Sequence, residues 1–313
     1  VTASAVDAAG NTATGTFKVT VRDSTPPTLT LPSDAMLEAT RPAGAVATFT
    51  ASAHDIVSGD VPVTFSIASG STFPLGTTVV TASAVDAAGN TATGTFKITV
   101  RDTTPPTLLL PVDLVLEATS PAGAVATFTA DAHDIVSGDL PVSFSIASGS
   151  VFPLGTTVVT ASAVDGTGNT ATGTFKITVR DTTAPQIVKL TASPSSLWPP
   201  NHRLVPVVLT AMVTDAADPA PKTHIISVSS NEPADEDEDE RERARGDHDR
   251  DDRPPGPDWI ITGDLTLKLR AEHGNRHSRR IYIITVESRD AAGNASTKTV
   301  TLAVQPREDR DDE

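Results

Sequence analysis

The sequence predicts an all-β chain built from tandem β-sandwich domains, and three observations support this prediction. Thr and Val, which favour pleated strands, are abundant, and 24 Pro and 20 Gly indicate frequent turns. A phrase that begins at Val1 returns at Val80 and Val159, which gives a repeat period of 79 residues. Apolar and polar residues alternate over short stretches, and no segment shows a convincing helical period.

The period divides the chain into sequence repeats that we read as domains. A truncated repeat covers residues 1–23, repeat A covers 24–102, repeat B covers 103–181, and a divergent terminal segment covers 182–306 before a charged tail at 307–313. Residues 27–102 of repeat A and 106–181 of repeat B differ at 11 of 76 aligned positions. Repeats of this length exceed most solenoid periods, so each is expected to be a whole domain.

Within repeat A, stretches with strand character are separated by Gly, Pro, Asp and Ser turns. Residues 96–100 alternate apolar and polar side chains, which predicts a strand with one face buried and the other in water. The strand before it places Val80, Ala82 and Ala84 on one face. The predicted strands are 28–31, 37–39, 45–53, 63–68, 77–86 and 96–100.

Short strands at this spacing within one 79-residue period fit an immunoglobulin-like β-sandwich. The linker at 102–106 carries Pro105 and Pro106, which lack a backbone donor and fix φ, so neighbouring domains are expected to bend little. We therefore predict tandem immunoglobulin-like domains arranged as a rod. Because the chain opens in the middle of a repeat, we expect it to be part of a longer protein.

Several motifs recur at fixed places in repeats A and B. Each repeat opens on Pro-Pro, carries an Asp-x-x-Ser-Gly-Asp turn at 55–60 or 134–139, and enters its penultimate strand through Phe-Pro-x-Gly-x-Thr at 73–78 or 152–157. Together with an Asp-x-x-Gly-Asn hairpin, this combination resembles the hyalin repeat (HYR) module. The resemblance covers repeats A and B.

The resemblance implies a sandwich related to fibronectin type III and immunoglobulin domains. It also implies extracellular adhesion or a surface scaffold, and therefore an extracellular or cell-surface location. Animal HYR modules often carry a cysteine pair, whereas this chain has no cysteine. That departure points to a bacterial secreted or surface form held together by its core alone.

The phrase Asp-x-x-Gly-Asn occurs four times, and two interpretations of it stay open. As a hairpin, Asp86 caps its own turn, Gly89 supplies a positive φ, and Asn90 tolerates the left-handed region. As a calcium site, oxygens of Asp86, Asn90 and a linker carboxylate such as Asp102 gather at a domain junction, because calcium accepts irregular oxygen cages. The calcium candidates are Asp86, Asn90, Asp102, Asp165, Asn169 and Asp181. No other cofactor is expected.

The terminal segment keeps the outline of a repeat but contains an insertion. Residues 210–230 parallel 50–70, and residues 281–304 repeat the last hairpin. The insertion at about 231–258 contains no apolar residue larger than Ala, apart from its prolines, so it is predicted to be a disordered charged loop. Surface aromatic residues in this segment could contact a partner or pack the edge of a sandwich. The contact candidates are Trp198, His202 and Trp259.

The sequence also argues against several classes of function. His54–Asp55 recurs at the same place in repeat B, inside a turn, and no nucleophile elbow or metalloprotease helix is present, so no enzymatic activity is expected. The net charge of −15 is the opposite of a nucleic-acid-binding footprint. No apolar run reaches the ~18 residues that a membrane span needs, so no membrane insertion is expected in this segment.

We predict a structural and adhesive repeat protein that acts as a stalk, surface scaffold or filament subunit. Its expected partners are other protein chains or cell-surface components. Exposed sheet edges could also pair between chains, which would build fibres by strand addition. Two alternatives stay open, namely a receptor- or carbohydrate-binding module and an accessory region of a larger secreted enzyme.

Overall fold

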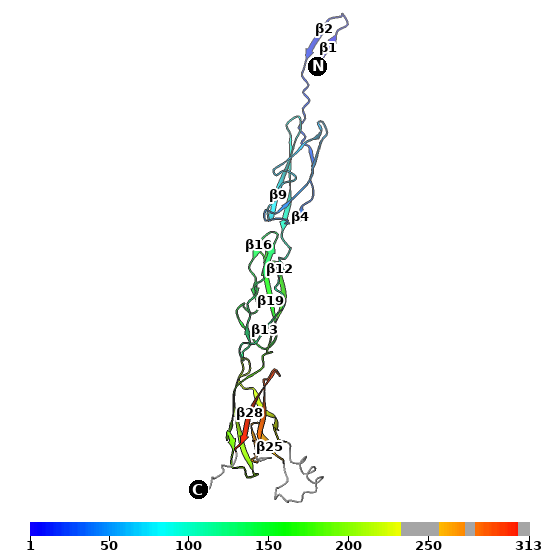
Figure 1. The fold of residues 1–313 in the computed structure, drawn as a ribbon. Helices are drawn as coiled ribbons and strands as arrows, with labels where there is room; N and C mark the ends of the chain where they lie inside the picture. The colour runs from blue at the N-terminus through cyan, green and yellow to red at the C-terminus, as the bar shows by residue number, and fades with distance from the viewer. Residues whose placement is uncertain (233–256, 273–278, 306–313) are drawn as a thin grey trace, which may run out of the picture. The chain divides into compact units, whose positions relative to one another are not determined.

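The computed structural model describes residues 1–232, 257–272 and 279–305, and these residues form strands and turns with no helix (Figure 1). The all-β prediction is confirmed. The predicted insertion at 231–258 and the tail at 307–313 lie almost entirely outside the described residues. By its internal contacts the chain divides into two compact units, Val1–Leu110 with Ala130–Phe144 and Thr160–Gly173, and Pro111–Thr129 with Ser145–Val159 and Thr174–Glu313.

Repeat A folds into a four-stranded sheet and a three-stranded sheet, with a short two-stranded ribbon beside them. The sheets have the orders β4-β11-β10-β8 and β3-β6-β7, and the ribbon is β5-β9. Most neighbours are antiparallel, but β4 runs parallel to β11. The strands are β3 (Thr28–Thr30), β4 (Ala35–Glu38), β5 (Ala45–Val46), β6 (Ser52–Asp55), β7 (Gly59–Val61), β8 (Val63–Phe65), β9 (Thr72–Phe73), β10 (Gly76–Val85) and β11 (Thr91–Arg101).

Repeat B forms the same arrangement one period later. Its sheets have the orders β13-β20-β19-β17 and β12-β15-β16, with the ribbon β14-β18. The strands are β12 (Thr107–Leu109), β13 (Leu114–Glu117), β14 (Ala124–Val125), β15 (Asp131–Asp134), β16 (Gly138–Leu140), β17 (Ser143–Phe144), β18 (Val151–Phe152), β19 (Gly155–Val164) and β20 (Thr170–Arg180).

The predicted strand at 45–53 is wrong, because the structure divides it into β5 and β6. β5 pairs with β9, whereas β6 pairs with β3 and β7, so the chain changes partners between them. In the gap, the Ala47 N–H donates to the Ser71 carbonyl, and the Phe49 N–H donates to the Ser69 hydroxyl at 2.8 Å. These loop bonds replace the sheet ladder, which local hydrophobicity does not reveal.

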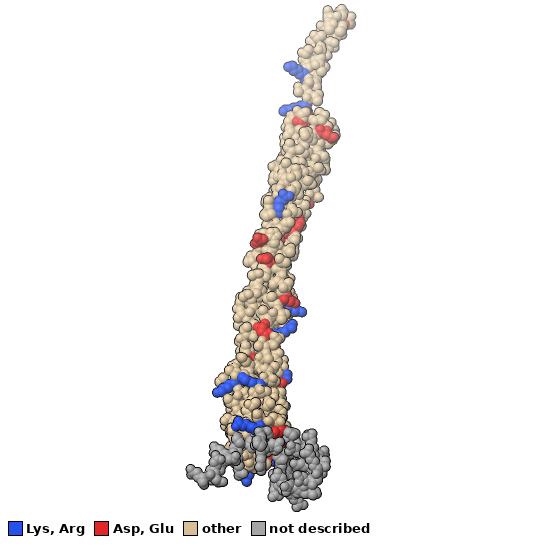
Figure 2. Space-filling view, viewed as in Figure 1, with Lys and Arg blue, Asp and Glu red and all other residues tan. Residues whose placement is uncertain are grey.

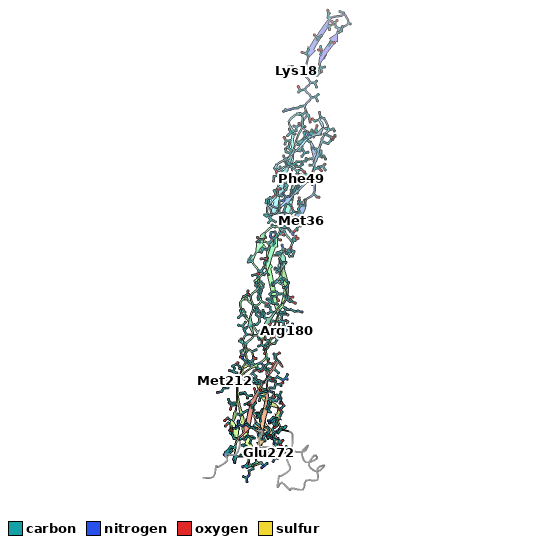
Figure 3. The ribbon with its side chains drawn as sticks, in the orientation of Figure 1. Lys18, Met36, Phe49, Arg180, Met212 and Glu272 are labelled. Atoms are coloured by element: carbon teal, nitrogen blue, oxygen red, sulfur yellow. The ribbon has the colours of Figure 1, made fainter. Side chains whose placement is uncertain are left out.

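The core of repeat A lies where the alternating pattern predicts it. Val80, Ala82 and Ala84 of β10 are buried, as are the apolar residues of 96–100 on β11. Phe49, labelled in Figure 3, stands edge-on to the ring of Phe96 at a centroid distance of 4.9 Å. Such edge-to-face pairs stabilise a core beyond their buried area.

The ends of the chain differ from the two full repeats. β1 (Thr2–Val6) and β2 (Thr12–Thr16) form an exposed hairpin. The terminal segment folds into two four-stranded sheets, ordered β21-β23-β26-β25 and β22-β28-β27-β24. Its strands are β21 (Gln186–Ser193), β22 (Ser196–Leu197), β23 (Leu204–Thr214), β24 (Lys222–Ser230), β25 (Trp259–Gly263), β26 (Thr266–Arg270), β27 (Ile281–Arg289) and β28 (Ala295–Val304).

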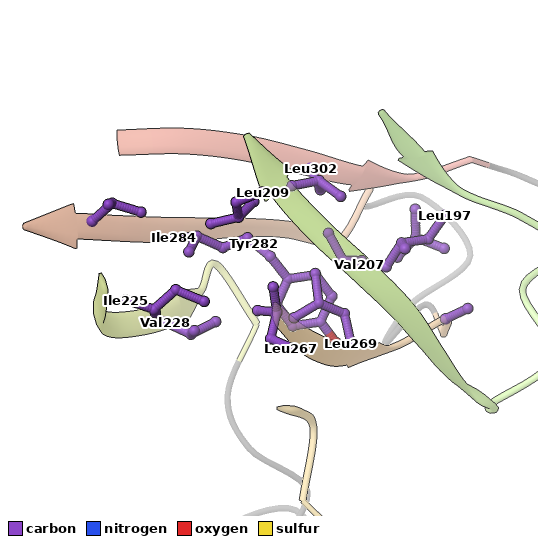
Figure 4. Close-up of a cluster of buried hydrophobic side chains, with 13 residues drawn as sticks. Leu197, Val207, Leu209, Ile225, Val228, Leu267, Leu269, Tyr282, Ile284 and Leu302 are labelled. Atoms are coloured by element: carbon purple, nitrogen blue, oxygen red, sulfur yellow. The ribbon is translucent and has the colours of Figure 1, made fainter. Parts of the chain in front are cut away.

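The terminal segment has a core of larger side chains. Figure 4 shows Leu267, Leu269, Ile284 and Leu302 packed around Tyr282, and all of them are buried. The Tyr282 hydroxyl donates to the Arg270 carbonyl at 2.9 Å, which satisfies its one polar atom. The two sheets therefore share a well-packed apolar interior.

Charged side chains are sparse on the face that Figure 2 shows, and over repeats A and B they stand singly or in small groups. The residues that the structure describes contain no helical segment whose length and apolarity would let it cross a membrane.

Candidate functional site

The Asp-x-x-Gly-Asn phrase of repeat A closes the hairpin between β10 and β11. The Asn90 N–H donates to Oδ1 of Asp86 at 2.8 Å, and the Asn90 side-chain amide donates to Oδ2 of Asp86 at 2.7 Å. Gly89 has a φ of 88°, which a residue with a side chain adopts only with strain. The hairpin interpretation is confirmed.

The same Asp–Asn bonding recurs at every copy of the phrase, namely at Asp7–Asn11, Asp165–Asn169 and Asp290–Asn294. In three copies the Asn amide also reaches the start of the domain. Asn90 donates to the Thr25 carbonyl at 3.4 Å, Asn169 to the Asp102 carbonyl at 3.1 Å, and Asn294 to the Asp181 carbonyl at 3.1 Å. These Asn amides therefore position the hairpin carboxylate and tie it to the linker.

Burial and hydrogen bonding act in opposite directions on the hairpin carboxylates. Burial raises the pKa of Asp86, but the hydrogen bonds from Asn90 outweigh it, and the pKa lies below its ordinary value. The pKa of Asp165 is lowered in the same way by Asn169 and Thr167, against the effect of burial. Both groups are therefore anions at neutral pH.

Two further aspartates converge on the hairpin of repeat A. Asp23, Asp55 and Asp86 each place one carboxylate oxygen within 4.8 Å of the other two. We call this group Asp triad A. Asp23 precedes β3, Asp55 ends β6, and Asp86 follows β10, so three distant parts of the chain build one cluster.

Asp triad A contains buried carboxylate oxygens that lack a donor. Asp55 is only 2% exposed; its Oδ1 accepts from the N–H groups of Val57 and Ser58 at 2.9 and 2.7 Å, whereas its Oδ2 has no hydrogen-bond partner. Oδ2 of Asp23 is also buried without a partner, although its Oδ1 accepts from the Thr25 N–H at 3.1 Å. A buried anionic oxygen without a hydrogen-bond donor is unfavourable, so a cation at this cluster would stabilise it.

Repeat B contains the equivalent group, Asp triad B. Asp102, Asp134 and Asp165 are all buried, and their carboxylate oxygens lie within the same 4.8 Å. Here the Thr167 hydroxyl lies 3.0 Å from Oδ1 of Asp165 and 3.3 Å from Oδ2 of Asp102, and it can donate its one proton to either carboxylate. Repeat A has Ala88 at that position, so triad A lacks this donor. Triads A and B are the two such groups found among the described residues.

The terminal segment has aspartates at the corresponding positions, namely Asp181, Asp215 and Asp290. Burial raises the pKa of Asp181; the Thr183 N–H opposes this effect, and repulsion from Asp290 and Asp215 adds to it. Oδ2 of Asp215 is buried and has no hydrogen-bond partner. The three carboxylates therefore interact electrostatically, although they are not among the groups that meet the 4.8 Å limit.

The structure groups the predicted calcium candidates in a way that the sequence did not. Asp102 lies with Asp165 in triad B, and the linker carboxylate beside Asp86 is Asp23. Sequence reasoning missed Asp23, and it assigned Asp55 and Asp134 to a turn. The signal that could have found all three was their 79-residue period, which they share with the hairpin aspartates.

The recurring His–Asp pair does not form a catalytic arrangement. His54 and Asp55 are neighbours on β6, where side chains alternate between faces, so Asp55 points inward and His54 outward. The exposed Nδ1 of His54 instead lies 2.7 Å from Oδ1 of Asp60, which is also exposed. His133 and Asp139 repeat this contact in repeat B at 2.7 Å.

Comparison with known protein families gives two matches, both to the HYR domain, at residues 22–100 and 101–179. Together these segments span just over half of the chain. The chain belongs to the HYR domain family. Each matched HYR segment contains one complete Asp triad, because Asp23 and Asp102 stand at the second position of their segments.

Two curated relatives of this HYR protein are both named Hyalin. One, from Lytechinus variegatus, is 37% identical over 194 residues, which cover 58% of this chain and 37% of that protein. The other, from Strongylocentrotus purpuratus, is 35% identical over 194 residues, which cover 58% of this chain and 16% of that protein. The match thus covers well under half the length of either relative.

Solved structures that resemble this HYR protein include cadherin ectodomains. Extracellular cadherin domains 1–4 of protocadherin gamma B7 align with a TM-score of 0.34 and 16% identity over 89% of this chain and 76% of that one. Domains EC22–24 of mouse cadherin-23 align with a TM-score of 0.32 and 15% identity over 90% of this chain and 99% of that one. At these scores the alignments are too loose to support any conclusion about this chain.

The predicted partner-contact residues lie outside the matched HYR segments, in the terminal segment. Trp198 is 51% exposed, and Nδ1 of His202, which is half-exposed, lies 3.2 Å from Oε2 of Glu272. Trp259 packs against the core, with its ring edge-on to Tyr282 at 6.4 Å. Of the three, Trp198 and His202 are therefore better placed for contact than Trp259.

Proposed function

We propose that this chain is the repeat region of an extracellular adhesive protein, in which tandem HYR domains act as a stiff spacer for the terminal segment. Membership of the HYR family and similarity to two hyalins support an adhesive role outside the cell. The near-identity of repeats A and B supports a spacer, because length and multiplicity matter more in a spacer than distinct sites. The absence of cysteine supports a bacterial form.

The observation that carries the spacer proposal is the way the linker residues are bound. Thr103 and Thr104, which follow repeat A, donate three hydrogen bonds to the carboxylate of Glu38. Pro105 and Pro106 come next and have no freedom in φ. The linker is therefore held by both its own geometry and a specific contact, which favours stiffness.

A buried contact supports the same proposal. Val136, in the β15–β16 turn of repeat B, is 8% exposed and belongs to the apolar cluster of repeat A within the first compact unit. Val57 occupies the same position in repeat A, where only the truncated repeat precedes it, and is 69% exposed. The valine at this position is therefore buried in repeat B, which a complete domain precedes, and exposed in repeat A, which only the truncated repeat precedes.

Self-assembly by strand addition is best supported at the terminal segment. In repeats A and B the sheets have short edge strands, such as β8 with three residues and β17 with two, and short edges present few unpaired groups. The edges β21 and β24 are eight and nine residues long. These edges are therefore where pairing with another chain would occur.

A second candidate function is recognition of a receptor or a carbohydrate by the terminal segment. The exposed Trp198 favours this function, because an indole offers a flat apolar platform with one polar atom. It is compatible with the spacer proposal, since a spacer displays something at its end. In either case the role is non-enzymatic, including where this region belongs to a larger secreted enzyme.

Small-angle X-ray scattering of the full chain tests the spacer proposal. The expected result is a maximum dimension several times that of one domain, which shortens on average when Pro105 and Pro106 are both replaced by Gly. A compact particle would overturn the stiff spacer. So would a maximum dimension that is the same in the wild type, in the proline variant and in Glu38→Gln. Binding of the chain to cells or glycans, with and without Trp198→Ala, separately tests recognition.

A further inference from the structure

We propose that Asp triads A and B each bind one calcium ion, which links the residue at the start of an HYR segment to two turns of the same segment. The proposal rests on the described side chains and not on the spacer function. Its strongest support is Oδ2 of Asp55, which is buried, has no hydrogen-bond partner and belongs to a residue that is 2% exposed.

The electrostatics of triad A require a positive partner. Three carboxylates carry a formal charge of about −3 within a few ångströms, and burial makes their repulsion stronger than in water. None of the ion pairs identified among the described residues includes a triad aspartate. A bound cation would neutralise the cluster and coordinate the partnerless oxygens of Asp23 and Asp55.

The carboxylates are already held in place for a ligand. Oδ1 of Asp55 is fixed by two backbone N–H groups, Oδ1 of Asp23 by the Thr25 N–H, and both oxygens of Asp86 by Asn90. These bonds leave free lone pairs on each carboxylate. Because the carboxylates need little reorganisation on binding, their ordering cost is small.

The donor set selects a hard cation. The triad consists only of carboxylate oxygens, with no thiolate or imidazole, which argues against zinc and copper. Calcium accepts oxygens from separate loops in irregular geometry, whereas magnesium demands a near-octahedral shell and keeps its waters. Triad B differs in having the Thr167 hydroxyl, which offers one hydrogen bond to its carboxylates but no positive charge.

Thermal unfolding of the full chain, freed of metal with a chelator and then titrated with calcium chloride, tests the proposal. We expect calcium to raise the unfolding midpoint by about 5 °C or more, and magnesium at equal concentration to raise it less. In Asp55→Asn/Asp134→Asn, the retained Oδ1 still accepts from the turn N–H groups, while the new amide removes one negative charge. This variant should melt higher without calcium and lose the calcium-dependent rise.

The control is Asp60→Asn/Asp139→Asn, which neutralises two exposed acids, the hydrogen-bond partners of His54 and His133. It should keep the full calcium response. Should the first variant fold poorly, Asp23→Asn/Asp102→Asn removes the linker carboxylates and must also lose the response. The proposal would be overturned if calcium raised the unfolding midpoint of the wild type by less than about 1 °C. It would also be overturned if both triad variants kept the full calcium-dependent increase. An equal rise with magnesium would overturn the choice of calcium.

Discussion

Glu38 accepts two hydrogen bonds from Thr103, a residue 65 positions further along the chain. The Thr103 N–H donates to Oε1 at 2.8 Å, and the Thr103 hydroxyl donates to Oε2 at 2.9 Å. The Thr104 hydroxyl adds a third bond to Oε1 at 2.9 Å. Glu117, Thr182 and Thr183 repeat the arrangement one period later, so this contact belongs to the repeat and not to one linker.

The pH dependence of stability should reveal the contact of Glu38 with Thr103. The Thr103 N–H, followed by the hydroxyls of Thr103 and Thr104, lowers the pKa of Glu38 below its ordinary value of 4.5. A lowered folded-state pKa means that Glu38 stabilises the fold fully above its ordinary pKa and loses this effect as pH falls through the folded value. Melting by circular dichroism should therefore show Glu38→Gln below wild type at neutral pH, with a gap that closes in acid.

Glu117→Gln supplies an independent copy of the same experiment. The hydrogen bonds from Thr182 and Thr183 also lower the pKa of Glu117, so its gap from wild type should close over the same acidic range. If the difference in melting temperature between Glu38→Gln and wild type stayed constant from neutral pH to about pH 3, the charge of Glu38 would contribute nothing to stability.

Gly123 is predicted to tolerate no side chain. Its φ is 112°, and a Cβ there would lie 1.8 Å from the backbone oxygen of Phe152, which cannot move without breaking the β14–β18 ribbon. Backbone strain alone costs about 1–3 kcal/mol at such a position, and the clash adds to it. Gly123→Ala should therefore lower the free energy of unfolding by at least that amount in urea titration.

Gly15→Ala is the matched control for Gly123→Ala. Gly15 lies in the exposed β2, has no positive φ, and would meet nothing within 4 Å. Its substitution should leave stability within about 0.5 kcal/mol of wild type. Similar effects for the two variants would mean that Phe152 does not constrain Gly123.

The sequence predicted what local patterns encode. Alternation over 96–100 placed the buried face of β11 correctly, and the Asp-x-x-Gly-Asn phrase predicted its hairpin, because both features depend on residues that are close together in the chain. The division of 45–53 into β5 and β6 was not predictable in this way, since it follows from hydrogen bonds to Ser69 and Ser71, some twenty residues further on.

The candidate site shows the same limit at longer range. The period identified Asp86 and Asp102 as members of a repeating set, but only the fold brings Asp55 and Asp23 to Asp86. Thr103 and Glu38 are 65 residues apart, and nothing in the local pattern around Glu38 indicates that its carboxylate faces a linker. Contacts of this kind depend on the turns of the sandwich and not on strand propensity.

Val136 is predicted to stabilise the chain where Val57 does not. Replacing Val136 by Ala removes about two buried methylene equivalents, which costs about 1.5 kcal/mol at roughly 0.8 kcal/mol each. Val57→Ala, at the equivalent but exposed position, should cost less than about 0.5 kcal/mol. Chemical unfolding of the two variants makes the comparison. Equal costs would contradict the burial of Val136 in the cluster of repeat A.

Arg280 is predicted to be essential for the terminal segment. It is buried, donates to the carboxylates of Asp258 and Glu272, and lies 5.2 Å from the ring centre of Tyr282. Glu272, which Figure 3 labels, is fully buried. The buried Nε of Arg270 lies 3.8 Å from Oδ1 of Asp258 and 3.9 Å from Oε2 of Glu272. Arg280→Met would therefore leave two buried carboxylates with Arg270 as their one remaining buried cation among the described residues, which costs about 3–5 kcal/mol.

The experiment on Arg280 separates the burial of charge from the loss of packing. The double variant Arg280→Met and Glu272→Gln removes one buried cation and one buried carboxylate and leaves Asp258 beside the buried Arg270, so it should recover much of the stability that Arg280→Met loses. Arg289→Met breaks a partly exposed pair with Glu287 and a hydrogen bond to the Gly293 carbonyl, and it should cost less than Arg280→Met. Calorimetry of the full chain resolves these effects if the terminal segment unfolds as its own transition. No recovery in the double variant would mean that Arg280 acts through its packing on Tyr282 and its bond to the Ser230 hydroxyl, and not through its charge.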